Sequence, residues 1–276
     1  MTLEFAICRE KHAIAEFQAT VRFTEPLDPG SFGDVSQAVT KTSQKMNLPA
    51  RVATPTFAFE FGQVGGAKFS PPPINPLAIG FQRFATNGEI DERISADPIS
   101  VSYVTRDYLG WEKTREVLSQ ALGEIAAQYA KRSLLVGTIQ LQYSNEFSSL
   151  KNGFMPAQAL FRKETRWVPP IFADLNDLWH SHVGMFLPGD GFKNLVNVNV
   201  DAVFATTAER SEEFTNVKLL IVAARQFNTL GGRPLAVTAS DMPTILLANL
   251  DAAHDLEKSV LFETLSDEYL RAVNAT

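Results

Sequence analysis

The residues best placed for chemistry lie near the C-terminus. Asp251, His254 and Asp255 are three, one and four residues apart, so they share one face if this segment is a helix. An adjacent His-Asp pair can bind a divalent ion that activates water, which makes a metal-dependent hydrolase one hypothesis. Apolar residues recur on the opposite face, which favours an amphipathic helix with an ordinary solvated side: Met242, Leu246, Ala253, Leu256 and Val260. We therefore expect no metal and no cofactor, and keep hydrolysis at His254 and Asp255 as an alternative.

A second pair of imidazoles stands at His180 and His182. The two side chains would point the same way on a strand, but to nearly opposite sides of a helix. Apolar spacing predicts a helix over 171–187, with one stripe formed by Leu175, Leu178, His182, Met185 and Phe186. This prediction argues against a shared metal ion.

A short cationic segment combines Arg162, Arg166 and Trp167, a set that can bind a phosphate or stack on a base. The chain has 25 Lys and Arg against 31 Asp and Glu, a net charge of −6 that gives a nucleic acid no general attraction. We expect a structural use of this segment, keep its three residues as ligand-binding candidates, and do not expect nucleic-acid binding.

Aromatic residues suggest a different kind of site. Five of the twenty Phe residues could line an apolar cavity between a sheet and a helix, namely Phe57, Phe59, Phe61, Phe81 and Phe84. Packing in the core is the simpler use of these rings. Trp111 and Tyr129, on the helix expected above such a cavity, are further ligand-binding candidates.

Several functional classes lack their signatures. The single cysteine, Cys8, allows no intrachain disulfide and no Cys-based zinc site, which favours a reducing compartment and predicts the cytoplasm. There is no Gly-x-Ser-x-Gly elbow, Walker motif or Gly-x-Gly-x-x-Gly sequence. The first residues are charged and the longest apolar run, 219–224, is far shorter than a membrane span, so we expect neither an export signal nor a membrane protein.

The periodicity of apolar residues defines the elements that must position these side chains. Alternation predicts strands and a spacing of three and four predicts helices. Strands are expected at 17–23, 57–61, on both sides of Asn87-Gly88, and at 99–103, 135–143, 196–202 and 217–227. Helices are expected at 31–46, about 111–129, 171–187 and 242–262, with a short one after Ser266.

This order predicts an α+β fold made of two tandem units, 1–132 and 133–276. Each unit would be an antiparallel sheet covered on one side by a long helix. The order is similar to helix-grip and TATA-binding-protein-like architectures, a likeness of fold that carries no function.

Four short motifs carry a resemblance to a known family. They are Val21-Arg22-Phe23, Tyr108-Leu109-Gly110-Trp111-Glu112, Leu141-Gln142-Tyr143-Ser144-Asn145 and Leu250-Asp251-Ala252-Ala253-His254-Asp255. In order and spacing they resemble a sporadically distributed prokaryotic family of uncharacterised proteins, in which Arg usually stands at the position of Gln142. The resemblance implies no activity, because none is established for the family.

From these observations the leading expectation is a non-catalytic protein that binds another protein, or a second copy of itself, through a sheet edge or a helix face. One alternative is a small-molecule binder or an enzyme that uses a cavity between the sheet and a long helix. The other is the metal-dependent hydrolase on the helix of His254 and Asp255.

Overall fold

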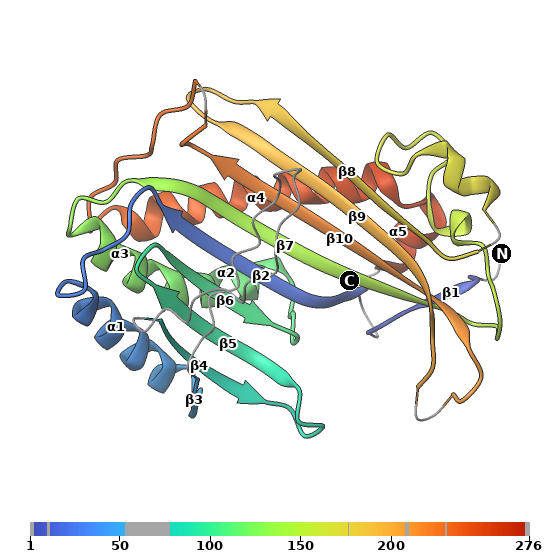
Figure 1. Ribbon diagram of the computed structural model, residues 1–276, viewed down its shortest axis with the longest axis horizontal. Coiled ribbons are helices and arrows are strands. Elements are labelled where there is room, and N and C mark those ends of the chain that lie inside the picture. The colour runs from blue at the N-terminus through green and yellow to red at the C-terminus, as the bar shows by residue number, and fades with distance from the viewer. Residues whose placement is uncertain are drawn as a thin grey trace, which may run out of the picture.

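A computed structural model gives the architecture, in which one antiparallel sheet runs the length of the molecule (Figure 1). It describes residues 3–9, 12–52, 78–175, 177–207, 210–229 and 231–273. The sheet has ten strands in the order β3-β4-β5-β6-β2-β7-β10-β9-β8, and β1 pairs with β7. The strands are β1 (Phe5–Ile7), β2 (Ile14–Phe23), β3 (Ala50–Val52), β4 (Ile79–Phe84), β5 (Ile90–Asp97), β6 (Ser100–Thr105), β7 (Val136–Ser149), β8 (Trp179–Pro188), β9 (Lys193–Ala205) and β10 (Phe214–Gln226).

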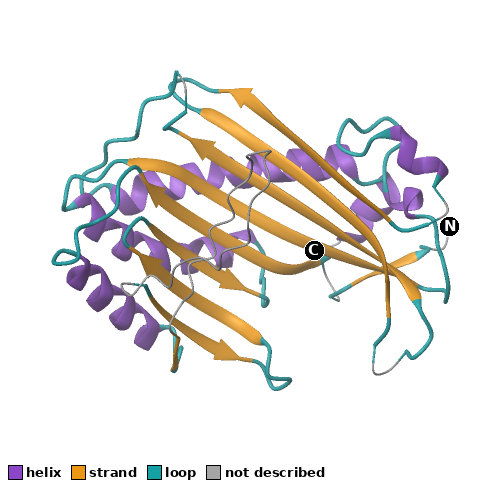
Figure 2. Cartoon of the chain, viewed as in Figure 1, coloured by secondary structure: helices purple, strands orange, loops and turns teal. Residues whose placement is uncertain are grey.

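The helices cover one face of this sheet (Figure 2). They are α1 (Phe32–Lys45), α2 (Trp111–Leu118), α3 (Glu124–Ala130), α4 (Met242–Thr264) and α5 (Asp267–Val273). A π-helical turn, Ser119–Gly123, joins α2 to α3. The longest helix, α4, packs on β7 and β10 and also contacts α2 and α3. It therefore connects the sheet to the other helices on that face.

Strict alternation along β7 explains why only one face of the sheet is covered. Ile139, Leu141 and Tyr143 are buried, whereas the residues between them are half-exposed. Side chains two apart on a strand point to the same face, so the apolar set of β7 lies under α4. Asn145 and Ser149 belong to the same buried set and are its polar members.

The α+β class is confirmed, and so are most of the predicted elements. The hairpin at Asn87-Gly88 joins β4 to β5, and the helices expected at 31–46, 111–129 and 242–262 are α1, α2 with α3, and α4. The strand expected at 57–61 lies outside the described residues.

The helix predicted over 171–187 is wrong. Residues Pro170–Asp174 form a 3-10 turn, and Trp179–Pro188 form β8, which pairs with β9 along its whole length. Trp179 and Ser181 are buried while His180 and His182 are exposed, which is the alternation of a strand. The apolar residues of 175–186 also fit a helical stripe, and only the pairing with β9 decides between the two structures.

The sheet continues across residue 132, because β2 pairs with β7 from Ile14↔Asn145 to Phe23↔Val136. The division into tandem units and the likeness to helix-grip or TATA-binding-protein-like folds stay predictions. Within the described part of the chain, no helix is both long enough and apolar enough to cross a bilayer.

Candidate functional site

The polar face of α4 meets the start of α2. Asp251 accepts two hydrogen bonds at Oδ1, from Nε1 of Trp111 at 3.1 Å and from Nε of Arg115 at 2.7 Å. Trp111 is the first residue of α2 and follows Gly110, whose φ of 94° favours glycine. This turn and the bonds to Asp251 together fix the indole against α4.

His254 lies one turn further along α4 and is held from two sides. Its ring stacks on Trp111 with centroids 4.3 Å apart and planes 11° apart. Its Nδ1 lies 2.9 Å from the hydroxyl of Tyr143, within hydrogen-bond distance. Burial lowers the pKa of His254 to about 4, so the imidazole is neutral at pH 7.

These side chains form part of the wall of a cavity of about 620 Å³ between the sheet and α4. We call it the Glu257 pocket. Its wall comes from the segment before β2, the loop before α2, β7, α4 and the end of α5, and includes Arg9, His12, Ala13, Ile14, Asp107, Tyr108, Leu109, Gly110, Trp111, Lys113, Tyr143, Asn145, His254, Glu257, Lys258, Leu261 and Val273.

Glu257 is the unusual group in this wall. The side chain is 4% exposed, and within the described ranges it makes neither a hydrogen bond nor an ion pair. Burial raises the pKa of its carboxyl to about 8, and the nearby charge of Lys258 opposes the shift only partly. At neutral pH the carboxyl therefore holds its proton.

The tyrosines of the pocket contact several neighbouring side chains. His12 contacts the carbonyl oxygen of Tyr108 through Nε2 at 2.8 Å and accepts the backbone N–H of Ile14 at Nδ1, at 3.2 Å. Tyr108 and Tyr143 pack edge to face, and burial raises the pKa of both hydroxyls. Both stay protonated at neutral pH and present hydroxyl groups rather than charges.

Chemically, the pocket combines a protonated carboxyl, a neutral imidazole and two phenols. A carboxyl with a raised pKa can donate a proton at pH 7, and a neutral imidazole can accept one. The same groups can also serve only as hydrogen-bond partners for a bound molecule. Either use requires a molecule in the cavity.

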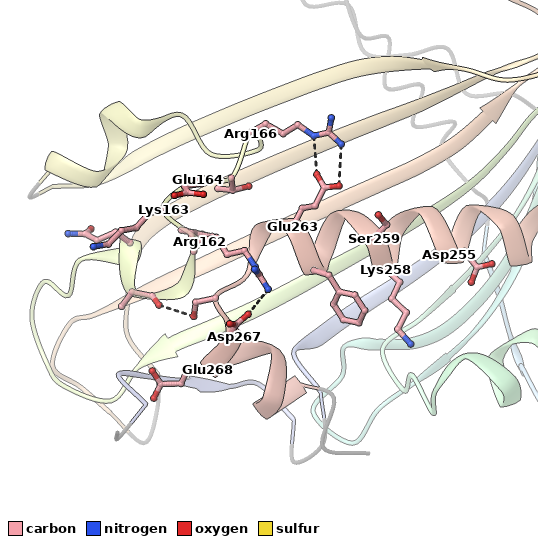
Figure 3. A pocket seen from close by; sticks show the side chains of 16 residues that line it. Arg162, Lys163, Glu164, Arg166, Asp255, Lys258, Ser259, Glu263, Asp267 and Glu268 are labelled. Atoms are coloured by element: carbon pink, nitrogen blue, oxygen red, sulfur yellow. Dashed lines mark hydrogen bonds and ion pairs between the residues drawn. The ribbon is translucent and has the colours of Figure 1, made fainter.

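A second hollow borders the C-terminal half of α4 (Figure 3). It is open, measures about 1,100 Å³ and contains the cationic segment; we call it the Arg162 groove. Figure 3 shows Arg166 facing Glu263, with Nε–Oε2 and Nη2–Oε1 distances of 3.0 and 3.3 Å. Arg162 donates to Asp267 at 2.5 Å and to the carbonyl oxygen of Leu265 at 3.0 Å.

Trp167 explains why these arginines are here. It is fully buried, and its Nε1 donates to Oε2 of Glu263 at 3.1 Å. The arginines and the indole thus attach the 161–167 segment to α4 and α5. Both arginine charges are already paired with carboxylates, so of the cations that line the groove only Lys163 and Lys258 have no carboxylate partner among the described residues.

The other predicted site residues lie outside the Glu257 pocket. Tyr129 is buried away from the Glu257 pocket, where its hydroxyl donates to the carbonyl oxygens of Asp97 and Ser100 at 2.5 and 2.9 Å. Asp255 is exposed and lines the Arg162 groove, whereas its neighbour His254 lines the Glu257 pocket. Across the described residues, no group of three or more His, Cys, Asp and Glu side chains is arranged to hold a metal ion.

The orientation predicted for His180 and His182 is also wrong, because it depended on a helix. On β8 both side chains are exposed on the same face of the strand. His180 contacts Asp201 of β9, with 2.5 Å between Nδ1 and Oδ1.

Sequence reasoning missed Glu257, Tyr108 and Tyr143 as site residues. A signal for Glu257 was present, since it falls four residues after Ala253 and three before Val260 on the apolar stripe of α4. A carboxylate at a core position of an amphipathic helix is rare enough to mark a site.

No family model, curated protein or solved structure matches the chain. The family resemblance of the motifs therefore stays a prediction. The structure nevertheless brings three of those motifs together at one place: Tyr108 and Trp111 from the second, Tyr143 and Asn145 from the third, and His254 from the fourth all line the Glu257 pocket.

Proposed function

We propose that this protein binds a small molecule in the Glu257 pocket, between the sheet and α4. The observation that carries the proposal is Glu257 itself, a buried carboxyl that lines a cavity and has no partner in the described part of the chain. Buried polar groups in folded proteins nearly always have a hydrogen-bond partner, because an unpartnered one is destabilising. A ligand would supply the missing partner.

The size and lining of the cavity support this function. Small-molecule sites typically measure roughly 300–1,000 Å³ and combine apolar and aromatic walls with a few polar groups. Here Trp111 and Leu261 supply apolar surface, and Tyr143, Asn145 and Glu257 supply polar groups. The proposal follows the small-molecule alternative from the sequence rather than the partner-protein expectation.

A thermal-shift screen of metabolites tests the proposal. A ligand that binds only the folded protein stabilises it, by about 2.7 kcal/mol at a concentration a hundred times its Kd. We expect at least one compound to raise the melting temperature. Leu261→Trp, which places an indole in the wall of the pocket, should abolish that stabilisation.

Phe262→Trp is the matched control, because it adds an indole on the same turn of α4 but faces the Arg162 groove. It should leave the stabilisation unchanged. The proposal is wrong if no compound stabilises the wild-type protein, or if the stabilisation persists in Leu261→Trp.

Binding of a partner protein or a second copy stays a prediction, and one feature favours it. Strand β8 is a ten-residue edge of the sheet, carries no Asp, Glu, Lys or Arg, and exposes 57% of Phe186. Uncharged edges of this length pair readily with further strands. Light scattering at two concentrations, repeated on Phe186→Lys, tests self-association.

A further inference from the structure

The ligand class of the Glu257 pocket follows from how its charged groups are distributed, and this inference rests on the proposed function. The acidic group, Glu257, is buried in the wall and unpartnered within the described residues. The basic groups Arg9, Lys113 and Lys258 are exposed, so water already solvates their charges. The charged group that lacks a partner among the described residues is thus the carboxyl of Glu257.

Aromatic side chains line the same cavity as Glu257. Tyr108, Trp111 and Tyr143 belong to its wall, and an aromatic ring carries partial negative charge on its π-face. A carboxylate combined with aromatic rings is the environment that binds an organic ammonium group, through an ion pair and cation–π attraction. The neutral imidazole of His254 adds no opposing charge.

We propose that the molecule bound in the Glu257 pocket carries a protonated amine, which Glu257 receives as a carboxylate and the rings of Tyr108 and Tyr143 flank. A ligand with an anionic group at this depth would place two negative charges together in a site of low dielectric constant. A neutral alcohol would satisfy a hydrogen bond but would gain no ion pair.

The proposal has a consequence for protons. Glu257 holds its proton below about pH 8, so binding an ammonium group at pH 7 transfers that proton to the buffer and leaves a carboxylate paired with the ligand. The titratable groups that line the cavity together with Glu257 are Lys258 and His254 on α4, Asp107, Tyr108 and Lys113 around the start of α2, Tyr143 on β7, and Arg9 and His12 before β2. Of these, Lys258 opposes the raised pKa and burial outweighs it.

Three probes of similar size test the ligand class: benzylamine, benzyl alcohol and benzoate, titrated by ligand-observed NMR at pH 7 up to about 10 mM. Benzylamine should bind at least about tenfold more tightly than the other two, as expected for a hydrogen bond between charged groups. Its affinity should rise by about tenfold per pH unit between pH 6 and 7.5, while the affinity of benzyl alcohol stays constant.

Glu257→Gln keeps the shape of the side chain and removes its charge, so it should weaken benzylamine binding at least about tenfold and leave benzyl alcohol unaffected. Glu112→Gln is the control, because Glu112 is an exposed carboxylate on α2 outside the cavity wall. Equal or tighter binding of benzyl alcohol or benzoate, or an unchanged benzylamine affinity in Glu257→Gln, overturns the amine proposal and leaves small-molecule binding standing. No binding by any of the three also overturns the amine proposal, whereas small-molecule binding is overturned by a thermal-shift screen that finds no stabilising compound.

Discussion

The Glu257 pocket and the Arg162 groove lie along the same helix and share Lys258, yet they use charge in opposite ways. In the groove, Arg162 and Arg166 each have a carboxylate partner within 3.0 Å. In the pocket, the described residues give the buried carboxyl of Glu257 none. The Arg162 groove is therefore a structural contact that holds the 161–167 segment on α4 and α5, and the Glu257 pocket is the better candidate site.

The two hollows differ in whether their charged groups already have partners within the described residues. Cations next to an aromatic ring look like a binding site in the sequence, but here they hold Trp167 and its segment in place. A buried, unpartnered carboxyl reduces stability, and selection tolerates such a group most easily where it serves a ligand.

The largest effect is expected from the structural anchor of the groove. Trp167→Ala removes a fully buried indole and its hydrogen bond to Glu263, so we expect the free energy of unfolding to fall by about 3–5 kcal/mol. Urea denaturation monitored by far-UV circular dichroism measures this loss. Phe262→Ala, an exposed aromatic of the same groove, should change it by less than about 1 kcal/mol. Similar losses in both variants would contradict a structural role for Trp167.

The second effect concerns the pH dependence of stability. The pKa of Glu257 rises on folding from 4.5 to about 8, so the folded protein keeps a proton that the unfolded chain releases. Stability must then fall as pH rises from about 4.5 to 8. Relative to wild type, Glu257→Gln should gain about 3 kcal/mol between pH 5 and pH 8, as measured by urea denaturation across this range.

The control for this profile is Glu112→Gln, which should follow the wild-type curve at every pH. His254 produces the opposite slope, because its pKa falls on folding from 6.5 to about 4 and stability is lost as pH drops through that interval. This slope is common to wild type and to both variants. A constant difference between Glu257→Gln and wild type would show that Glu257 is not the source.

The smallest effect is expected at the surface of the groove. Arg166→Met breaks the ion pair with Glu263, whose partners are both about half-exposed, so the loss should be about 0.2–1 kcal/mol and should shrink in 1 M salt. Urea denaturation at low and high salt measures it. A loss above about 2 kcal/mol would mean that the arginine does more than pair with Glu263.

Much of the fold could be predicted because its elements have clean periodicity. The alternation along β7 and the stripe along α4 are visible in any short window of sequence. The strand β8 was predicted as a helix because Leu175, Met185 and Phe186 fit either period, and its pairing with β9 is a contact between segments. Local patterns cannot show such a contact.

The candidate site was predicted only in part for the same reason. His254 and Trp111 were singled out separately, but their stacking joins residues that are far apart in the chain. The His-Asp pattern marks the polar face of α4, whereas Glu257 is a charged residue on the buried face of that helix. The arginines of the groove were found as cations, and only the structure shows their partners.

The continuity of the sheet across residue 132 also bears on how the gene could be divided. A break after Arg132 would separate β2 from β7 and leave each fragment with a bare strand whose natural neighbour is on the other piece. Two such fragments, expressed together, have the complementary surfaces needed to reassemble without a covalent link. The loop at that position is thus the place at which to test whether two fragments of the chain reassociate.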